Sequence, residues 1–156
     1  MKEQVFFDAG LEGMRVWESG VIMARHYALR DAQKFNLETV VELGSGTGIA
    51  GLALIKYTRA AKVVFTDYKE EILDLIRENI ELQGPTRVSH DVENVDFTDE
   101  KTWERLLHME HIDRVVATDV VYQAILVEKL AKLIRTIKDK HPRCQIEVMM
   151  PNGRGK

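Results

Sequence analysis

The sequence feature that most constrains the fold is a glycine-rich turn at residues 44–48, between a short apolar run and a helical pattern. The run at residues 40–43 is β-branched and apolar, whereas residues 49–57 are rich in Ala and Leu. Glycines at such a turn permit positive φ angles and let a ligand approach the backbone closely. The helix that follows offers free N–H groups and the positive end of its dipole. The pattern therefore predicts a ligand site at the carboxyl end of a parallel strand.

The rest of the chain alternates short apolar runs with longer helical patterns. Further strands are predicted at residues 62–66, 87–91, 114–118 and 145–150, and helices at 20–30, 69–82 and 126–140, with a short helix around Trp103. This alternation is typical of an α/β fold in which helices cover both faces of a mostly parallel sheet. At 156 residues the chain suggests one domain, with an extension and helix over 1–38 and a Rossmann-like core over 39–150.

Charge and composition argue against several kinds of binding partner. The net charge is −3 and no stretch concentrates Lys and Arg on one face, so we expect no nucleic acid. The single cysteine, Cys144, cannot form an internal disulfide, which favours a reducing compartment, cytoplasmic or nuclear. No signal peptide or membrane-spanning run is evident, and the histidines lack metal-ligand spacing, so we expect neither a membrane association nor a metal.

A carboxylate follows the second predicted strand. Asp67 can accept hydrogen bonds from both hydroxyls of an adenosine ribose, and Tyr68 offers an aromatic surface to an adenine. Residues 46–51 also match G-x-G-x-x-G, so an NAD-binding Rossmann domain stays open. Glu42, at the end of the first strand, favours S-adenosylmethionine because it could face the ammonium of a methionine moiety but would oppose a pyrophosphate. No second domain remains to hold a hydride acceptor.

Four motifs in order carry a family resemblance: Trp17-Glu18-Ser19-Gly20, the segment 42–48, Thr66-Asp67 and Asp119-Val120-Val121-Tyr122. Over roughly residues 14–150 the chain resembles the seven-β-strand protein lysine methyltransferases of the methyltransferase-like 21 group (family 16). The resemblance implies a Rossmann-like fold and S-adenosylmethionine as cofactor. The cofactor-binding residues expected are Trp17, Glu42, Gly44, Ser45, Gly46, Gly48, Asp67, Tyr68, Asp96, Phe97 and Thr118.

The aromatic residues near these motifs are each expected to have a particular position or role. Asp96-Phe97 matches the family's adenine region, where many members have Trp at the second position, so Phe97 keeps the ring but lacks an indole N–H. Trp17 is expected over the cofactor entrance, with a core anchor for the first helix as the alternative. Trp103 has no motif around it and is expected to be a packing residue.

Asp119 and Tyr122 are the candidate catalytic residues. Three positions apart beyond the fourth strand, they could hold a cationic acceptor amine beside the methyl group, because a carboxylate and an aromatic face both attract a cation. The alternative is that Asp119 caps the next helix. We expect direct in-line transfer to a neutral lysine of a protein substrate, with Asp119 orienting the amine.

The chain ends soon after the fifth predicted strand, whereas family members continue with a further helix and two strands. We therefore expect a fold that lacks the last strands of the seven-strand methyltransferase. The fifth strand would then be an exposed edge, which invites self-association. A cofactor-binding or protein-interaction module without turnover is the alternative function.

Overall fold

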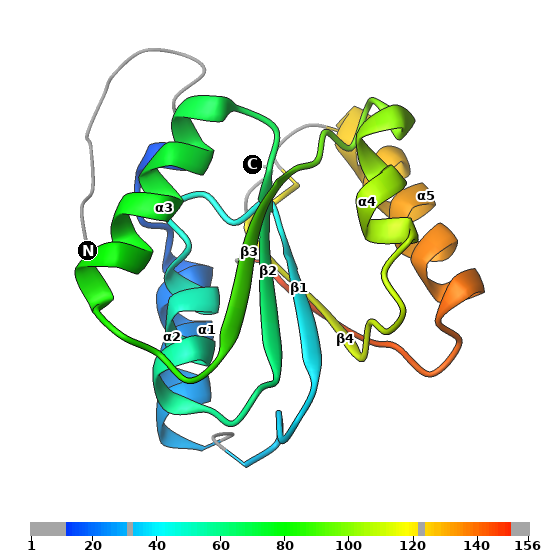
Figure 1. The fold of residues 1–156 in the computed structure, drawn as a ribbon. Helices are drawn as coiled ribbons and strands as arrows, with labels where there is room; N and C mark the ends of the chain where they lie inside the picture. Colours follow the sequence, from blue (N-terminus) through cyan, green and yellow to red (C-terminus); the bar gives the residue numbers. More distant parts are fainter. Residues whose placement is uncertain (1–11, 31–32, 122–123, 151–156) are drawn as a thin grey trace.

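The computed structural model describes residues 12–30, 33–121 and 124–150. Their strands form one five-stranded sheet (Figure 1). All its pairings are parallel, in the order β3-β2-β1-β4-β5. The strands are β1 (Thr39–Leu43), β2 (Lys62–Asp67), β3 (Ser89–Asn94), β4 (Arg114–Thr118) and β5 (Gln145–Met149). The expected Rossmann-like architecture is confirmed.

Helices cover both faces of this sheet (Figure 1). On one face lie α1 (Glu18–Leu29), α2 (Ile49–Tyr57) and α3 (Glu70–Gln83); on the other lie α4 (Glu104–Leu107) and α5 (Ala124–Lys140). Two 3-10 turns, η1 (Glu12–Met14) and η2 (Glu100–Trp103), precede α1 and α4. Each face has its own apolar core, because alternate residues of the strands point to opposite sides.

The strand order reverses between β1 and β4. The chain moves outward from β1 through β2 to β3, and then returns to place β4 on the other side of β1. At the carboxyl ends of these neighbours, Leu43 pairs with Ala117. Since the crossovers on the two sides of β1 lead away from each other, they leave a crevice between these two strand ends. The glycine turn follows β1 directly and lies at this crevice.

The third strand differs from its predicted range. It spans Ser89–Asn94 rather than residues 87–91, and most of its residues are only partly buried. Its length follows from the register with β2, which pairs Lys62 with Ser89 and Asp67 with Asn94. β3 is an edge strand of the described sheet and five of its six side chains are polar, so apolar alternation is a poor guide to its bounds.

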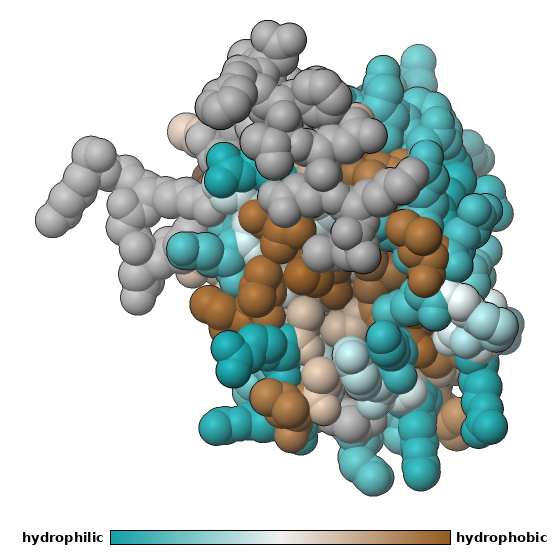
Figure 2. All heavy atoms as spheres, turned by 90° about the vertical axis from the view of Figure 1, so that its left-hand side faces the viewer, coloured by the Kyte–Doolittle hydropathy of each residue, from teal (hydrophilic) through white to brown (hydrophobic). Residues whose placement is uncertain are grey.

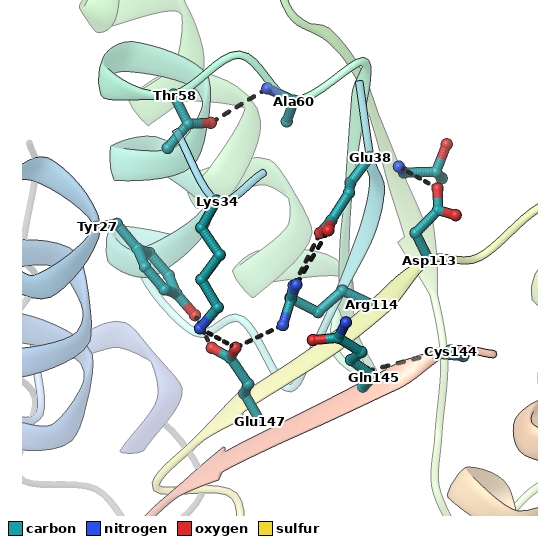
Figure 3. A network of polar contacts seen from close by, with 11 residues as sticks. Tyr27, Lys34, Glu38, Thr58, Ala60, Asp113, Arg114, Cys144, Gln145 and Glu147 are labelled. Carbon is teal, nitrogen blue, oxygen red and sulfur yellow. Dashed lines mark hydrogen bonds and ion pairs between the residues drawn. The ribbon is translucent and has the colours of Figure 1, made fainter. Parts of the chain in front are cut away.

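A polar network lies toward the amino ends of β1 and β4 (Figure 3). The Arg114 side chain, 2% exposed, donates two hydrogen bonds to the Glu38 carboxylate at 2.8 and 3.0 Å and one to Glu147 at 2.6 Å. Glu147 also pairs with Lys34 at 2.6 Å and accepts from the Tyr27 hydroxyl at 3.3 Å. These contacts connect four parts of the fold: α1, the segment that precedes β1, strand β4 and strand β5. The network therefore stabilises the tertiary structure.

Apolar side chains gather on the surface that carries α1, α2 and α3 (Figure 2). A groove of about 440 Å³ runs there, and Val21, Tyr57 and Leu82 on its walls are 37%, 49% and 60% exposed. At the far side of the sheet, β5 is an edge strand among the described residues, so self-association through it stays a prediction. None of the described helices combines the length and apolar character needed to cross a membrane.

Candidate cofactor site

A cavity of about 330 Å³ opens at the carboxyl ends of the strands, over the crevice between β1 and β4. We call it the switch-point cavity. Its walls include ten of the residues predicted from the sequence: Trp17, Gly44, Ser45, Gly46, Asp67, Tyr68, Asp96, Phe97, Thr118 and Asp119. The structure therefore brings together residues from five separate segments of the chain, as the motif order predicts.

The glycine turn forms the floor of the cavity. Gly44 and Gly46 adopt φ angles of 63° and 55°, in the left-handed region that disfavours other residues. A Cβ atom at Gly46 would lie 2.9 Å from the Gly13 carbonyl oxygen, and one at Gly44 would lie 2.7 Å from a Val120 methyl. The turn thus needs glycine for conformation and for space. Gly48 does not line the cavity; it precedes α2 as its N-cap.

Hydrogen bonds fix this turn to the end of β2. The Ser45 hydroxyl donates to the Glu42 carbonyl at 3.2 Å and accepts from the Thr66 N–H at 3.0 Å. The Ser45 N–H donates to the Thr66 carbonyl at 2.7 Å. Ser45 therefore lines the cavity while its hydroxyl bonds to the backbone, and its polar groups hold the floor in place.

Asp67 connects the floor with the adjoining wall. Its carboxylate accepts from the Gly46 N–H at 3.0 Å and from the Tyr68 N–H at 2.8 Å, and the residue is 5% exposed. Burial raises the pKa of Asp67, and these backbone N–H groups act against that rise. The side chain is thus an oriented acceptor at the end of β2, and its role as a ribose-binding carboxylate stays a prediction.

Glu42 lies outside the cavity, contrary to its expected position beside a methionine ammonium. Its side chain is 1% exposed, and it accepts from the Gly51 N–H at 3.2 Å beneath the turn. A Cβ at Gly51 would lie 2.6 Å from a Glu42 carboxyl oxygen, so the missing side chain of α2 makes room for this orientation. Burial raises the pKa of Glu42 to about 8, which keeps the carboxyl mainly protonated at neutral pH.

The loop after β3 forms a further part of the cavity wall. Phe97 is 9% exposed and lines the cavity beside Asp96, whose carboxylate accepts from the Thr98 N–H and hydroxyl, each at 2.7 Å. The indole N–H of Trp103 donates to the Asp96 carbonyl at 2.7 Å, and this tryptophan is 2% exposed. Trp103 is the expected packing residue, and it also anchors the loop that carries Asp96 and Phe97.

Asp119 is at the end of β4, with Thr118 beside it on the cavity wall. Asp119 has a φ of 58° and is 9% exposed. Its carboxylate accepts from the Ser19 N–H at 3.0 Å, in the first turn of α1. Asp119 therefore caps α1, a helix that precedes it in the chain, and a cap on the helix that follows it stays a prediction. Tyr122 lies outside the described residues.

Ten of the described residues that line the cavity are not among those predicted from the sequence, and two of these, Gly13 and Arg15, belong to the segment expected to be an extension. Gly13 lies against Gly46, and Arg15 lines the cavity with its guanidinium carbon 4.5 Å from the Trp17 ring centroid. The signal available was a basic residue two positions before the Trp-Glu motif. Among the described residues that line the cavity, Arg15 is the one permanent cation, and Asp67, Asp96 and Asp119 carry carboxylates. The described ranges hold no cluster of metal-ligating side chains.

Similarity to known proteins covers most of the chain. The family model for lysine methyltransferases matches residues 8–152. The mouse protein-lysine N-methyltransferase EEF2KMT is 28% identical over 140 residues, which are 83% of this chain and 41% of that protein. The protein-lysine N-methyltransferase EFM3 of Chaetomium thermophilum is 24% identical over 146 residues, 88% of this chain and 42% of that one. The chain thus spans about two-fifths of the length of these relatives.

Solved structures share the fold. A structure described as precorrin 8W decarboxylase from Methanobacterium thermoautotrophicum matches with a TM-score of 0.60 at 22% identity, over 82% of this chain and 61% of that one. An S-adenosylmethionine-dependent methyltransferase from Clostridium acetobutylicum matches with a TM-score of 0.54 at 12% identity, over 81% and 46%. At these identities the likeness concerns architecture. The match of the family model, together with the motifs gathered at the switch-point cavity, shows that the chain belongs to the lysine methyltransferase family.

Proposed function

We propose that this protein is an S-adenosylmethionine-dependent methyltransferase that methylates a lysine side chain of another protein. The observation that carries the proposal is a single cavity formed by the glycine turn, Asp67, the Asp96-Phe97 loop and Asp119. The names of the relatives support a protein lysine as acceptor.

The charges around the cavity fit the proposed cofactor. S-adenosylmethionine has a positive sulfonium and a positive ammonium, as well as one carboxylate, so its net charge is positive. The cavity has carboxylates at Asp67, Asp96 and Asp119 and a guanidinium at Arg15. We infer that Asp67 accepts from the ribose hydroxyls, Phe97 and Tyr68 contact the adenine, and Arg15 binds the methionine carboxylate. A dinucleotide fits less well because its pyrophosphate would bring two negative charges to this surface.

The side chains of the cavity supply orientation and electrostatics. When bound, the cofactor supplies a methyl group on a positively charged sulfur. A free lysine has a pKa of about 10.4, so its amine must lose a proton before it can attack. A position beside a positive charge lowers that pKa, and the wall formed by Thr118, Asp119 and Trp17 would hold the amine in line.

Calorimetry tests the cofactor. We expect S-adenosylhomocysteine to bind the wild type, and Asp67→Ala to weaken that binding by about 100-fold, because the ribose loses charge-assisted acceptors. Asp74→Ala is the matched control: Asp74 is an exposed carboxylate on α3 that pairs with Arg77. Binding of NAD alone would contradict the proposal.

Transfer of a radiolabelled methyl group into polypeptides of a cell lysate tests the activity, and mass spectrometry of the labelled product identifies the modified residue. We expect label on lysine. If S-adenosylhomocysteine binds but no polypeptide is labelled, a cofactor-binding module without turnover becomes the better account.

A further inference from the structure

Helix α1 begins without a cap of its own. The first N–H groups of a helix have no partner within the helix, and Ser, Thr, Asp or Asn at the N-cap commonly accepts from one of them. In α1 the N-cap residue is Trp17, which makes no side-chain cap hydrogen bond. The Ser19 N–H instead donates to the Asp119 carboxylate at 3.0 Å, across 100 positions of the chain. A residue at the end of β4 therefore caps a helix that precedes β1.

Position 119 meets two separate requirements. Its φ of 58° lies in the left-handed region, which glycine adopts freely and which Asp and Asn tolerate better than other residues. Its side chain must also reach the Ser19 N–H with an acceptor. Asp and Asn meet both requirements, glycine meets only the first, and alanine meets neither.

The capped helix controls one wall of the switch-point cavity. Residues 12–20, here called the amino-terminal segment, supply Arg15, Trp17 and Gly20 to the lining. The fit at Gly20 is close, because a Cβ there would lie 2.8 Å from an Ile49 methyl and 3.6 Å from the Thr118 hydroxyl. A helix end seated this closely cannot shift without moving Trp17.

We propose that Asp119 is a positioning residue that seats the amino-terminal segment over the cavity by capping α1. The bond from Ser19 then fixes Trp17 and Arg15 at the site where the cofactor binds. This role replaces the expectation that Asp119 acts mainly by its charge on the acceptor amine. The inference rests on the proposed function only for the identity of the cofactor.

Three variants separate the requirements at this position. Asp119→Asn keeps the backbone conformation and the acceptor, Asp119→Gly keeps only the conformation, and Asp119→Ala keeps neither. Ser19→Ala is the matched control, because it alters the side chain but retains the N–H that donates to Asp119. Thermal unfolding identifies the variants that fold, and Asp119→Gly keeps the test valid if Asp119→Ala does not.

The first measurement needs no cofactor. Acrylamide quenching of tryptophan fluorescence reports mainly on Trp17, because Trp103 is 2% exposed and contributes little. Trp17→Phe assigns the signal. We expect stronger quenching in Asp119→Gly and Asp119→Ala, and wild-type quenching in Asp119→Asn and Ser19→Ala.

The second measurement is the affinity for S-adenosylhomocysteine. We expect about tenfold weaker binding in Asp119→Gly and Asp119→Ala, which is the size of effect that loss of an N-cap produces, and binding within about threefold of wild type in Asp119→Asn. If Asp119→Asn weakens binding as much as Asp119→Ala while quenching stays unchanged, charge is the property that matters and the proposal is overturned. If the wild type binds no S-adenosylhomocysteine, the proposed function fails, and the quenching series still decides whether Asp119 seats Trp17.

Discussion

Buried charged side chains have different partners at the two ends of the sheet. Toward the amino ends, the guanidinium of Arg114 meets the carboxylates of Glu38 and Glu147, and cation and anion satisfy each other. At the carboxyl ends, the carboxylates of Asp67 and Asp119 meet backbone N–H groups of Gly46 and Ser19.

The difference indicates which end has a structural role and which binds a ligand. An ion pair that is complete within the protein has little further attraction for a ligand, whereas carboxylates held by neutral N–H groups leave a negative field that favours a cationic ligand. The network around Arg114 therefore stabilises the fold, and the switch-point cavity is the end suited to a positively charged cofactor.

Removal of Arg114 gives the largest expected effect. Arg114→Ala leaves Glu38 and Glu147 without their buried cation, so we expect the free energy of unfolding to fall by about 3–5 kcal/mol in urea titrations. The exposed Arg77, paired with Glu70, is the control, and Arg77→Ala should lower it by less than about 1 kcal/mol. Affinity of the folded variant for S-adenosylhomocysteine should stay within about threefold; a parallel loss of affinity would break the distinction between the two ends.

Glu42 gives a pH-dependent effect of intermediate size. Its pKa is raised by burial from 4.5 to about 8, so the native state holds a proton that the unfolded chain has lost between these values. Glu42 therefore makes the free energy of unfolding fall as pH rises through this window, by as much as about 1.4 kcal/mol per pH unit.

Glu42→Gln is neutral at every pH and can still accept from the Gly51 N–H. Relative to wild type, the variant should thus gain stability as pH rises from about 5 to 8 in urea titrations. Asp67, whose pKa burial also raises, is present in both proteins, so the comparison leaves mainly the contribution of Glu42 and its electrostatic interaction with Asp67. Parallel pH profiles for the two proteins would show that Glu42 is not shifted by its burial.

Removal of Arg15 gives the smallest expected effect, and it tests the ligand-binding role of the carboxyl ends of the strands. Arg15→Met should weaken binding of S-adenosylhomocysteine by about tenfold, as loss of one charge-assisted contact would, and change the free energy of unfolding by less than about 0.5 kcal/mol. Arg15→Lys, which keeps the charge, should recover most of the affinity. The ligand control is 5′-methylthioadenosine, which lacks the methionine carboxylate and should bind wild type and Arg15→Met equally; a preference for wild type would assign Arg15 to another role.

The sequence predicts those parts of the molecule that local chemistry determines. The strand, glycine turn and helix around residues 40–57 follow from apolar runs and from residues that permit positive φ. The positions of Asp67 and Asp119 follow from the rule that parallel strands end together at one edge of a sheet. The sequence therefore predicts ten of the twenty described residues that line the cavity.

What the sequence leaves open is the direction of side chains and the choice of distant partners. Glu42 turns beneath the floor because Gly51 on the next helix leaves space, a fact that strand periodicity does not contain. Asp119 bonds to Ser19, 100 positions earlier in the chain, because the fold brings its left-handed backbone next to the start of α1, which has no side-chain cap of its own. The register of the polar edge strand β3 likewise depends on its neighbour β2.

The bond between Ser19 and Asp119 also bears on the order of events during protein synthesis. The two residues are 100 positions apart. At about 5–20 residues per second, a ribosome needs roughly 5–20 s to progress from one to the other. During that interval the amino-terminal segment has been synthesised, but Asp119, which caps α1, has not. Strand β4, which ends at the cavity, is also incomplete. The part of the cavity wall that is made first is therefore completed only after β1, β2, β3 and β4 have been translated.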